Sequence, residues 1–424
     1  MFKGFDRKTL MQFIILAFSG EVVFYVIFGF RTSYYMALLE VLGINNEQFG
    51  LVMTVYGWIA VVGYLVGGYL ADKISTRVLM STTFLSTSIL YFIYGLFPSY
   101  AILMAVFIGF GFSTSFTYWA ALQKATRIIG RKIGSESKAF GFLQTGRDLF
   151  GVFTIAVSVV VFNQIVNLVF GLRFVIWWFA AWLFIFGIVS IFVFDREPDP
   201  EAMSDKDFFG HLFECVKNPN VWLCTLMAYG GFFLGIGRNP NIVLVDILGM
   251  SHGNAAYVTS ILKYLLLIGA FATAFIAQRF GPSIVLFYNT ILQMLTAAAT
   301  IYLLIYPNLY AYITIMVLQQ ILVGSFRCQK FATIREGRVP MHISGAALGF
   351  ISFVIYTSDA WPYAVFGRWM DQLGYVDGLI KIHYLLIAMG MITIISTIVF
   401  RIVNKQNIKD VLEEEKQKRL ALEG

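Results

Sequence analysis

Twelve long apolar stretches, separated by short polar segments, constrain the fold of this chain more than any other feature. Each has the length of about 20 mostly apolar residues that a helix needs to cross roughly 30 Å of hydrocarbon. They lie near residues 10–40, 47–71, 78–97, 101–122, 138–161, 174–194, 221–247, 256–277, 283–305, 310–328, 344–366 and 379–401. Charged residues make up 13% of the chain, against roughly 25% in soluble domains, which is too few to cover a water-soluble globule. We therefore expect an all-α membrane protein with twelve transmembrane helices, surrounded by membrane lipid.

The distribution of basic residues predicts the orientation in the membrane. If the N-terminus is cytoplasmic, the loops on the outer side hold only Arg173, Arg368 and Lys381, and the other loop cations, including Lys330 after the tenth stretch, face the cytoplasm. Cytoplasmic loops are enriched in lysine and arginine because these residues resist translocation. The net charge of +7 is thus explained without a nucleic-acid partner. We expect an integral protein of the cell membrane (inner or plasma) with both termini in the cytoplasm.

The longest polar interruption before the tail, Asp195 to Asn220, falls after six stretches. It divides the chain into an N-terminal six-helix bundle (1–194), a cytoplasmic linker (195–220), a C-terminal six-helix bundle (221–403) and a cytoplasmic tail (404–424). The tail is expected to be a short charged helix that lies in solvent and takes no part in transport.

An internal repeat supports the two bundles. Similar residues recur at a nearly constant offset of 206 to 208 positions: Gly43 and Gly249, Lys73 and Arg279, Gln123-Lys124 and Gln329-Lys330, and Ala139-Phe-Gly-Phe142 and Ala347-Leu-Gly-Phe350. Each match is weak alone, but four at nearly one offset indicate tandem halves, the parallel repeat of one class of secondary transporters. We therefore expect two pseudo-symmetric six-helix bundles.

The segment between the second and third stretches, Gly68-Tyr-Leu-Ala-Asp-Lys-Ile-Ser-Thr-Arg77, resembles the signature loop of the major facilitator superfamily. It departs from that pattern at Ser75, usually a glycine, and at Thr76, usually a basic residue. The resemblance implies that Asp72, Lys73 and Arg77 form a latch that closes the cytoplasmic side and releases when the two halves rock. The alternative is a basic loop that only sets the topology. Membership of the family also implies a monomer.

Two further segments resemble narrower branches of that family. Arg31 ahead of Gly43-Ile-Asn-Asn-Glu-Gln-Phe-Gly50 is similar to the organic-phosphate antiporters, which place one arginine on the first helix of each half. The stretch Phe140-Gly-Phe-Leu-Gln-Thr-Gly-Arg147 resembles bacterial permeases associated with sugar acids and sulfosugars. Both imply a small organic anion as the substrate, although Lys263 stands in a region where the phosphate antiporters carry an acidic residue.

Two arginines within the apolar stretches are the main candidates for substrate binding. A charged side chain at the membrane centre costs about 2.5–3.5 kcal/mol on insertion scales and therefore suggests a function. Arg31 and Arg238 lie in the first and seventh stretches, 207 positions apart, so the repeat makes them nearly equivalent. Facing each other, their guanidinium groups would clamp a carboxylate, phosphate or sulfonate. The alternative is that each pairs with an intramembrane acid for structural reasons.

Other residues can complete such a site. The run Gly235-Ile-Gly-Arg-Asn-Pro-Asn241 is predicted to unwind the seventh helix and to offer a ligand its backbone groups, which makes Asn239 a candidate. Tyr34 and Tyr35 follow Arg31 by three and four residues and can hydrogen-bond a substrate, or can belong to an interfacial tyrosine belt. Arg147 can line the cavity.

Two aspartates are candidates for proton coupling. Asp359 interrupts the eleventh stretch and could carry a proton, although pairing with Lys263 fits equally well. Asp148 is the second candidate. The histidines are expected in loops or at helix ends: His211, His252, His342 and His383. A phosphate-binding glycine loop with lysine is absent from the sequence, as is a CxxC pair, so we expect no ATP-driven step, no metal and no other cofactor.

These features together predict secondary active transport of a small organic anion, such as a sugar acid, sulfonate or phosphate ester, by alternating access. Coupling could be proton symport or anion exchange. The alternative is a transporter of a neutral sugar or drug in which the arginines are structural. An enzyme is not expected, because the apolar stretches hold neither paired carboxylates nor a histidine cluster near one face.

Overall fold

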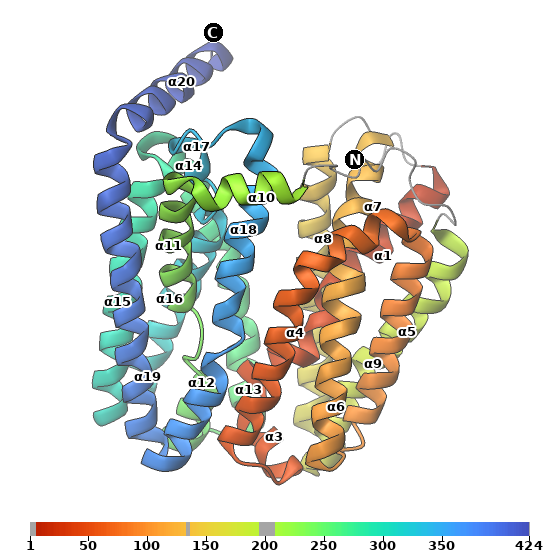
Figure 1. Cartoon of the computed structure of the whole chain (residues 1–424). Coiled ribbons are helices and arrows are strands. Elements are labelled where there is room, and N and C mark those ends of the chain that lie inside the picture. The colour runs from red at the N-terminus through yellow and green to blue at the C-terminus, as the bar shows by residue number, and fades with distance from the viewer. Residues whose placement is uncertain (1–5, 133–135, 195–207, 424) are drawn as a thin grey trace. The chain divides into compact units, whose positions relative to one another are not determined.

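The computed structural model of the chain describes residues 6–132, 136–194 and 208–423; within them a few side chains, that of Asp72 included, are not described. All regular elements of these ranges are helices (Figure 1). The chain forms two compact units. Unit 1 comprises Met1–Ser204 and Met250–Ser260, and unit 2 comprises Asp205–Gly249 and Ile261–Gly424. The predicted all-α fold class is confirmed.

Unit 1 contains the first half of the chain. Its helical segments are α1 (Arg7–Phe24), η1 (Tyr25–Gly29), α2 (Phe30–Ser33), α3 (Tyr35–Leu42), α4 (Asn46–Lys73), α5 (Thr76–Tyr94), α6 (Tyr100–Gly111), η2 (Phe112–Tyr118), α7 (Trp119–Lys132), α8 (Glu136–Gln164) and α9 (Leu168–Val193). Much of α13 (His252–Leu262) also belongs to this unit. The start of α4 follows from its sequence: the Asn45 side chain accepts a hydrogen bond from the Gln48 N–H, and the Gln48 side chain accepts one from the Asn45 N–H. This capping box satisfies two N–H groups that a helix start leaves open.

Unit 2 contains most of the second half. Its segments are α10 (Phe208–Lys217), α11 (Pro219–Phe233), α12 (Pro240–Ile242), η3 (Val243–Ile247), η4 (Lys263–Leu265), α14 (Leu266–Phe280), α15 (Pro282–Ile305), α16 (Leu309–Gln329), α17 (Thr333–Glu336), η5 (Met341–Ile343), α18 (Ser344–Tyr356), η6 (Thr357–Asp359), α19 (Pro362–Val403) and α20 (Lys405–Glu423). Gly374, at φ 82°, breaks the helical backbone within α19, so this element comprises two successive helices. The described part of the predicted linker contains the helix α10.

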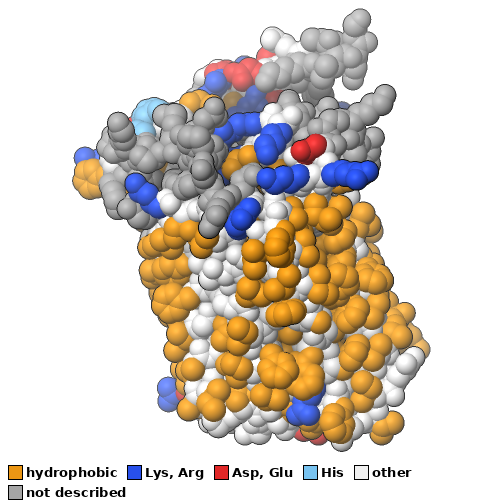
Figure 2. All heavy atoms as spheres, turned by 90° about the vertical axis from the view of Figure 1, so that its right-hand side faces the viewer, with side chains coloured by type: hydrophobic (Ala, Val, Ile, Leu, Met, Phe, Trp, Pro, Cys, Tyr) orange, Lys and Arg blue, Asp and Glu red, His pale blue; other side chains and the backbone are white. Residues whose placement is uncertain are grey.

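The surface of the helices suits lipid. Among the described residues, eight helical stretches are long and apolar enough to cross a membrane, and one of them, Met341–Val403, has the length of two spans. Figure 2 shows one face on which hydrophobic side chains form a broad band and most lysines and arginines gather toward one end. Exposed large apolar side chains of α5 and α9 include Ile89, Phe92, Phe170, Phe184 and Phe192. The elements are consistent with the predicted twelve spans.

The internal repeat appears in the backbone. Gly43 ends α3 with φ 63° and Gly249 follows η3 with φ 66°. A left-handed residue at this place is a common way to end a helix, and glycine adopts it without a side-chain clash. The two glycines therefore recur in the sequence because the same helix-ending turn recurs in each half.

The C-terminal helix differs from its prediction. Figure 1 shows α20 continuing from the end of α19, and the side chains of Ile408 and Val411 are 5% and 4% exposed. Arg338 donates to Glu414 at 2.7 Å, and Arg335 pairs with both Glu414 and Glu415. The apolar contacts, rather than these exposed ion pairs, hold the helix, because exposed pairs contribute little. The prediction that the tail lies free in solvent is wrong for this part of α20.

A buried carboxyl joins α17 to the start of α15. Glu336 is fully buried, and its Oε2 accepts a hydrogen bond from the Ser283 N–H at 2.9 Å. Arg401 donates to the Ser283 hydroxyl at 2.7 Å. Gly281, at φ 91°, lies so close to the carboxyl that a Cβ there would sit 2.4 Å from Oε1. The site thus needs both the glycine and an acceptor at the N-terminus of α15, where the helix dipole favours negative charge.

This carboxyl leads to a pH-dependent prediction. Burial raises the pKa of Glu336 above its ordinary value of 4.5, and the nearby Arg401 charge opposes the rise. The folded protein therefore binds this proton more tightly than the unfolded chain, so the contribution of Glu336 to stability is full below pH 4.5 and falls as the pH rises through the raised pKa. We expect Glu336→Gln, which keeps the acceptor without the charge, to remove this decline. The check is the melting temperature of both proteins across pH 4 to 8, roughly the range of carboxyl titration. Parallel curves for the two proteins would contradict it.

Candidate transport site

Arg31 lies in the first helical run of the chain, between η1 and α3. The π-helical segment η1 precedes it, and such segments often occur at functional sites. Arg31 belongs to the short helix α2, in the last turn of the membrane-spanning stretch Arg7–Ser33. Its Nε and Nη1 atoms are buried, although the residue as a whole is partly exposed. Arg31 thus lies just before the break at Tyr34, after which α3 continues to Leu42.

The seventh span is broken at Arg238, as the sequence predicts. Helix α11 ends at Phe233 and α12 begins at Pro240. Between them Gly237 has φ 72° and Asn239 has φ 39°, conformations that glycine and asparagine tolerate best. The break leaves backbone groups outside any regular helix, and both Arg238 and Asn239 are buried there, at 5% and 7% exposure.

Arg238 is held by neutral oxygen acceptors of unit 2. Its Nε donates to the Leu234 carbonyl at 2.9 Å, Nη1 to the Thr296 hydroxyl at 3.0 Å and Nη2 to the Gln293 carbonyl at 2.9 Å. The ion pairs among the described residues do not include Arg238. Of the five N–H groups of a guanidinium, these hydrogen bonds within the unit therefore use three. These partners are not acids, so the pairing that the structural alternative required is not seen in the described residues.

Further buried polar groups accompany Arg238. His383 is fully buried within the second helix of α19, and its charge environment includes Arg238. Its Nδ1 lies 2.7 Å from the Leu379 carbonyl, an acceptor, so Nδ1 carries the proton and Nε2 is left as an acceptor. Within the described part of the chain, His383 Nε2 and Gln293 Oε1 are buried without a hydrogen-bond partner. The expectation that His383 lies in a loop or at a helix end is wrong, because the kink at Gly374 starts its helix nine residues earlier.

Arg147 pairs with an acid from another helix. Its Nε lies 3.9 Å from Glu21 Oε2, joining α8 to α1. The two helices approach closely, since a Cβ on Gly20 would lie 2.8 Å from Arg147 Cδ and one on Gly151 would lie 2.9 Å from Glu21 Cγ. Arg147 is thus neutralised in unit 1, in contrast to Arg238 in unit 2. Asp148, next in sequence, accepts hydrogen bonds from Gln144 of the same helix.

The two tyrosines after Arg31 point to different partners. Tyr34 is fully buried, and its ring contacts those of Phe30 and Phe162. Tyr35 donates its hydroxyl hydrogen to Asn46 Oδ1 at 2.9 Å. Neither lies in an exposed interfacial belt.

Asp359 and Lys330 are candidate charges in unit 2. Asp359 lies in η6 and accepts a hydrogen bond from the Tyr363 hydroxyl at 2.8 Å. Lys330 caps the end of α16 and is only 8% exposed. The sequence predicts that Lys330 follows the tenth span on the cytoplasmic side, and that side stays a prediction. The burial of this side chain was not predicted from the sequence.

The predicted gate is described in part. Arg77 Nε donates to the Phe194 carbonyl at the end of α9, at 2.8 Å, while Lys73 is exposed. The side chain of Asp72 lies outside the described part. Arg77 therefore ties α5 to the carbonyl end of α9, where the helix dipole favours a cation.

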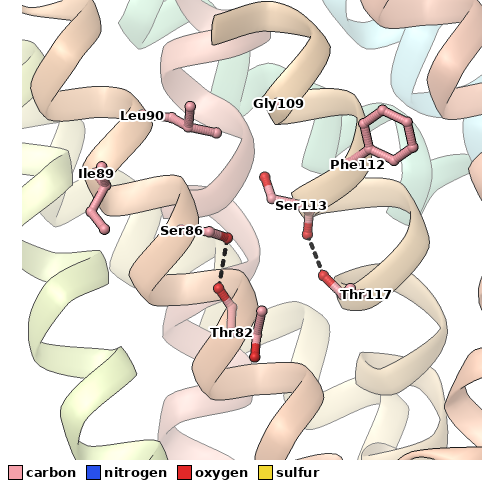
Figure 3. A pocket seen from close by; sticks show the side chains of 8 residues that line it. All are labelled: Thr82, Ser86, Ile89, Leu90, Gly109, Phe112, Ser113 and Thr117. Atoms are coloured by element: carbon pink, nitrogen blue, oxygen red, sulfur yellow. Dashed lines mark hydrogen bonds between the residues drawn. The ribbon is translucent and has the colours of Figure 1, made fainter.

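A cavity of about 380 Å³ lies elsewhere in unit 1, between α5 and the segment α6–η2. Figure 3 shows the hydroxyls of Thr82, Ser86, Ser113 and Thr117 at this cavity, two of them bonded along their own helices. Ile89 and Phe112, which also line it, are 60% and 52% exposed. The cavity therefore opens on the apolar flank of the unit, and it contains none of the residues that the sequence singled out.

Comparison with known proteins gives the family. The model of the Major Facilitator Superfamily matches residues 16–360. Inner membrane protein YqcE of Escherichia coli (strain K12) is 22% identical over 410 residues, 91% of this chain and 93% of YqcE. Inner membrane protein YihN of the same organism is 24% identical over 384 residues, 86% of this chain and 89% of YihN.

Solved structures agree on the fold. The nucleoside transporter NupG superposes with a TM-score of 0.71 at 16% identity, over 93% of this chain and 98% of NupG. A bacterial homologue of the human lysosomal transporter Spinster gives 0.67 at 15% identity, over 95% of this chain and 96% of the homologue. At such identities the likeness shows the fold alone. With the family model, the two helical units and the inner-membrane relatives, it shows that this chain is an integral membrane transporter, not an enzyme, and belongs to the major facilitator superfamily.

Proposed function

We propose that the chain is a secondary active transporter of a small organic anion, such as a sugar acid, sulfonate or phosphate ester. It works by alternating access, coupled to protons or to exchange of a second anion. Arg31 and Arg238 bind the anionic group, with Asn239, Tyr34 and Tyr35 nearby in sequence. Arg147 is a weaker candidate, because Glu21 already balances its charge.

The observation that carries the proposal is the state of Arg238. A buried charge is tolerated when it is paired or fully hydrogen-bonded. Arg238 has three neutral acceptors, and none of the ion pairs among the described residues supplies it with a carboxylate. Its remaining positive charge and two unused N–H groups suit a carboxylate, sulfonate or phosphate, which a guanidinium binds through two parallel hydrogen bonds.

The proposal includes the surroundings of the site. Asp359 and Asp148 remain the candidates for a coupling proton. Asp72, Lys73 and Arg77 form the cytoplasmic gate, supported by the Arg77 contact that joins α5 to α9. Both termini lie in the cytoplasm, and the protein works as a monomer.

A second candidate is a neutral polyhydroxylated solute. Gln293 Oε1 and His383 Nε2 are buried acceptors near Arg238, without a partner in the described part of the chain. Solute hydroxyls can donate to such acceptors, whereas an anionic group cannot. NupG, which shares the fold, is a nucleoside transporter. In this reading Arg238 only organises the polar interior of unit 2.

A binding screen separates the two candidates. The purified full chain is titrated by calorimetry with three anions, glucuronate, isethionate and glycerol phosphate, and two neutral solutes, glucose and uridine. The proposal expects one anion class to bind and Arg31→Gln to weaken it at least about tenfold, the loss of one charged hydrogen bond. The matched control is Arg173→Gln, an outer-end arginine bonded to the Gly95 carbonyl. Binding of neutral solutes alone, unchanged in Arg31→Gln, would favour the second candidate.

A further inference from the structure

A lysine in unit 2 is enclosed by aromatic rings from three segments. The Nζ of Lys330 lies 5.0 Å from the ring centre of Phe232 in α11, 4.8 Å from that of Phe331 and 5.5 Å from that of Tyr356 in α18. We call this group the lysine cage. Lys330 itself is 8% exposed, whereas the three rings are each partly exposed. The ammonium is thus buried among three partly exposed rings.

The repeat-related lysine has a different environment. Lys124 in α7, at the equivalent position of the first half, donates to the Ala71 carbonyl at 2.6 Å. It therefore balances the negative end of α4, a structural role for a cation. In unit 2 the hydrogen bond to the neighbouring helix comes from Gln329 instead, whose Nε2 donates to the Thr273 carbonyl. Lys330 therefore does not make the hydrogen bond to a neighbouring helix that Lys124 makes in the first half.

The rings alone compensate the buried charge poorly. Burying an ammonium carries a penalty of several kcal/mol, while each cation–π contact returns about 0.5–2 kcal/mol. Two described charges act on Lys330 from a distance, Asp359 favourably and Arg327 unfavourably. None of the ion pairs among the described residues includes Lys330. A negative group that arrives with a ligand would complete this site.

We propose that the lysine cage binds the anionic group of the transported solute, with Lys330 as its cation and the rings of Phe232, Phe331 and Tyr356 around it. This rests on the proposed function and adds a cation from α16 to those of the first and seventh spans. The ring faces also suit the apolar face of a sugar ring, which favours a sugar acid over a bare inorganic anion. Arg238 and Lys330 then supply two positive groups within unit 2.

The stability of the ligand-free protein tests the role of Lys330. If Lys330 serves to bind an anion, its buried charge destabilises the ligand-free protein. Lys330→Met, similar in length and uncharged, is therefore expected to leave the melting temperature unchanged or to raise it. Lys124→Met is the matched control and is expected to lower it, because it loses the bond to Ala71. If Lys330→Met instead melts several degrees lower than the wild type, the lysine stabilises the fold and the proposal is overturned.

Calorimetry with glucuronate, isethionate and glycerol phosphate provides the second arm. Lys330→Met is expected to weaken the bound anion at least about tenfold, with partial recovery in Lys330→Arg, while Lys124→Met retains the wild-type affinity. An anion that binds wild type and Lys330→Met equally, yet loses affinity in Arg31→Gln, would overturn the lysine cage and leave the anion transporter standing. A wild type that binds only glucose or uridine would overturn both.

Discussion

Alanine at Gly324 or Gly269 is expected to unfold much of unit 2 or to prevent its insertion. The two glycines lie where α14 and α16 cross. A Cβ on Gly324 would lie 1.9 Å from the Leu266 carbonyl oxygen, and one on Gly269 would lie 1.8 Å from that of Ile321. Both neighbours are backbone atoms, so a rotamer change cannot relieve the clash and the helices must separate. Membrane helices pack through small residues for this reason, and overpacking of this severity costs more than the usual 1–3 kcal/mol.

The measurement is the folded yield and melting temperature of each variant in detergent. Gly345→Ala and Gly349→Ala in α18 are the matched controls, because a Cβ at either position meets no atom within 4 Å. Alanine there should be neutral or stabilising by up to about 1 kcal/mol, the difference in helix propensity. Wild-type stability in Gly324→Ala would contradict the close backbone contact between α14 and α16.

Replacing Arg238 by glutamine is expected to abolish binding and to lower stability at the same time. The shorter side chain cannot reach Leu234, Gln293 and Thr296, so three hydrogen bonds from a charged donor are lost, at about 1.5–3 kcal/mol each. Relief from burying the cation offsets several kcal/mol of this loss. We expect a net destabilisation of about 2–3 kcal/mol, which is several degrees in melting temperature.

The comparison with Arg31→Gln makes the result interpretable. Arg31 is partly exposed and lies in the last turn of its span, so its substitution should reduce anion affinity with a smaller change in melting temperature. Arg238→Lys keeps the charge but loses the planar set of guanidinium N–H donors. Relative to Arg238→Gln, it should recover part of the anion affinity and little of the stability. Unchanged stability in Arg238→Gln would mean that its three hydrogen bonds contribute nothing net. Unchanged anion affinity in a folded Arg238→Gln would remove this residue from the site.

The sequence pairs Lys124 with Lys330 but does not predict the surroundings of either lysine. The repeat pairs them correctly, and both stand near the same end of corresponding helices. Lys124 donates to the Ala71 carbonyl in one unit, whereas Lys330 lies among the rings of Phe232 and Tyr356 in the other. These neighbours are between 26 and 98 positions away in the sequence, and periodicity carries no information about them.

The partners of charged side chains were likewise not predictable from the sequence. Glu21 and Arg147 are 126 positions apart in the sequence, whereas the structure places Glu21 Oε2 3.9 Å from Arg147 Nε, on two neighbouring helices. Glu336 gave no signal at all, because a glutamate in a short polar segment looks solvated until α15 and α19 are packed around it. His383 was misplaced because one glycine kink moved the start of its helix.

The sequence by itself determined the helical membrane fold, the twofold repeat with its helix-ending glycines, the break of the seventh span at Arg238 and the membership of a transporter family. These follow from local properties: apolar length, glycine and proline positions, and a recurring motif. Only the tertiary structure decided which charges meet an opposite charge, as Arg147 meets Glu21, and which are buried among neutral groups, as Arg238 and Lys330 are. The reason is physical, since the free energy of a buried charge depends on atoms within a few ångströms, and those atoms come from helices that only packing brings together.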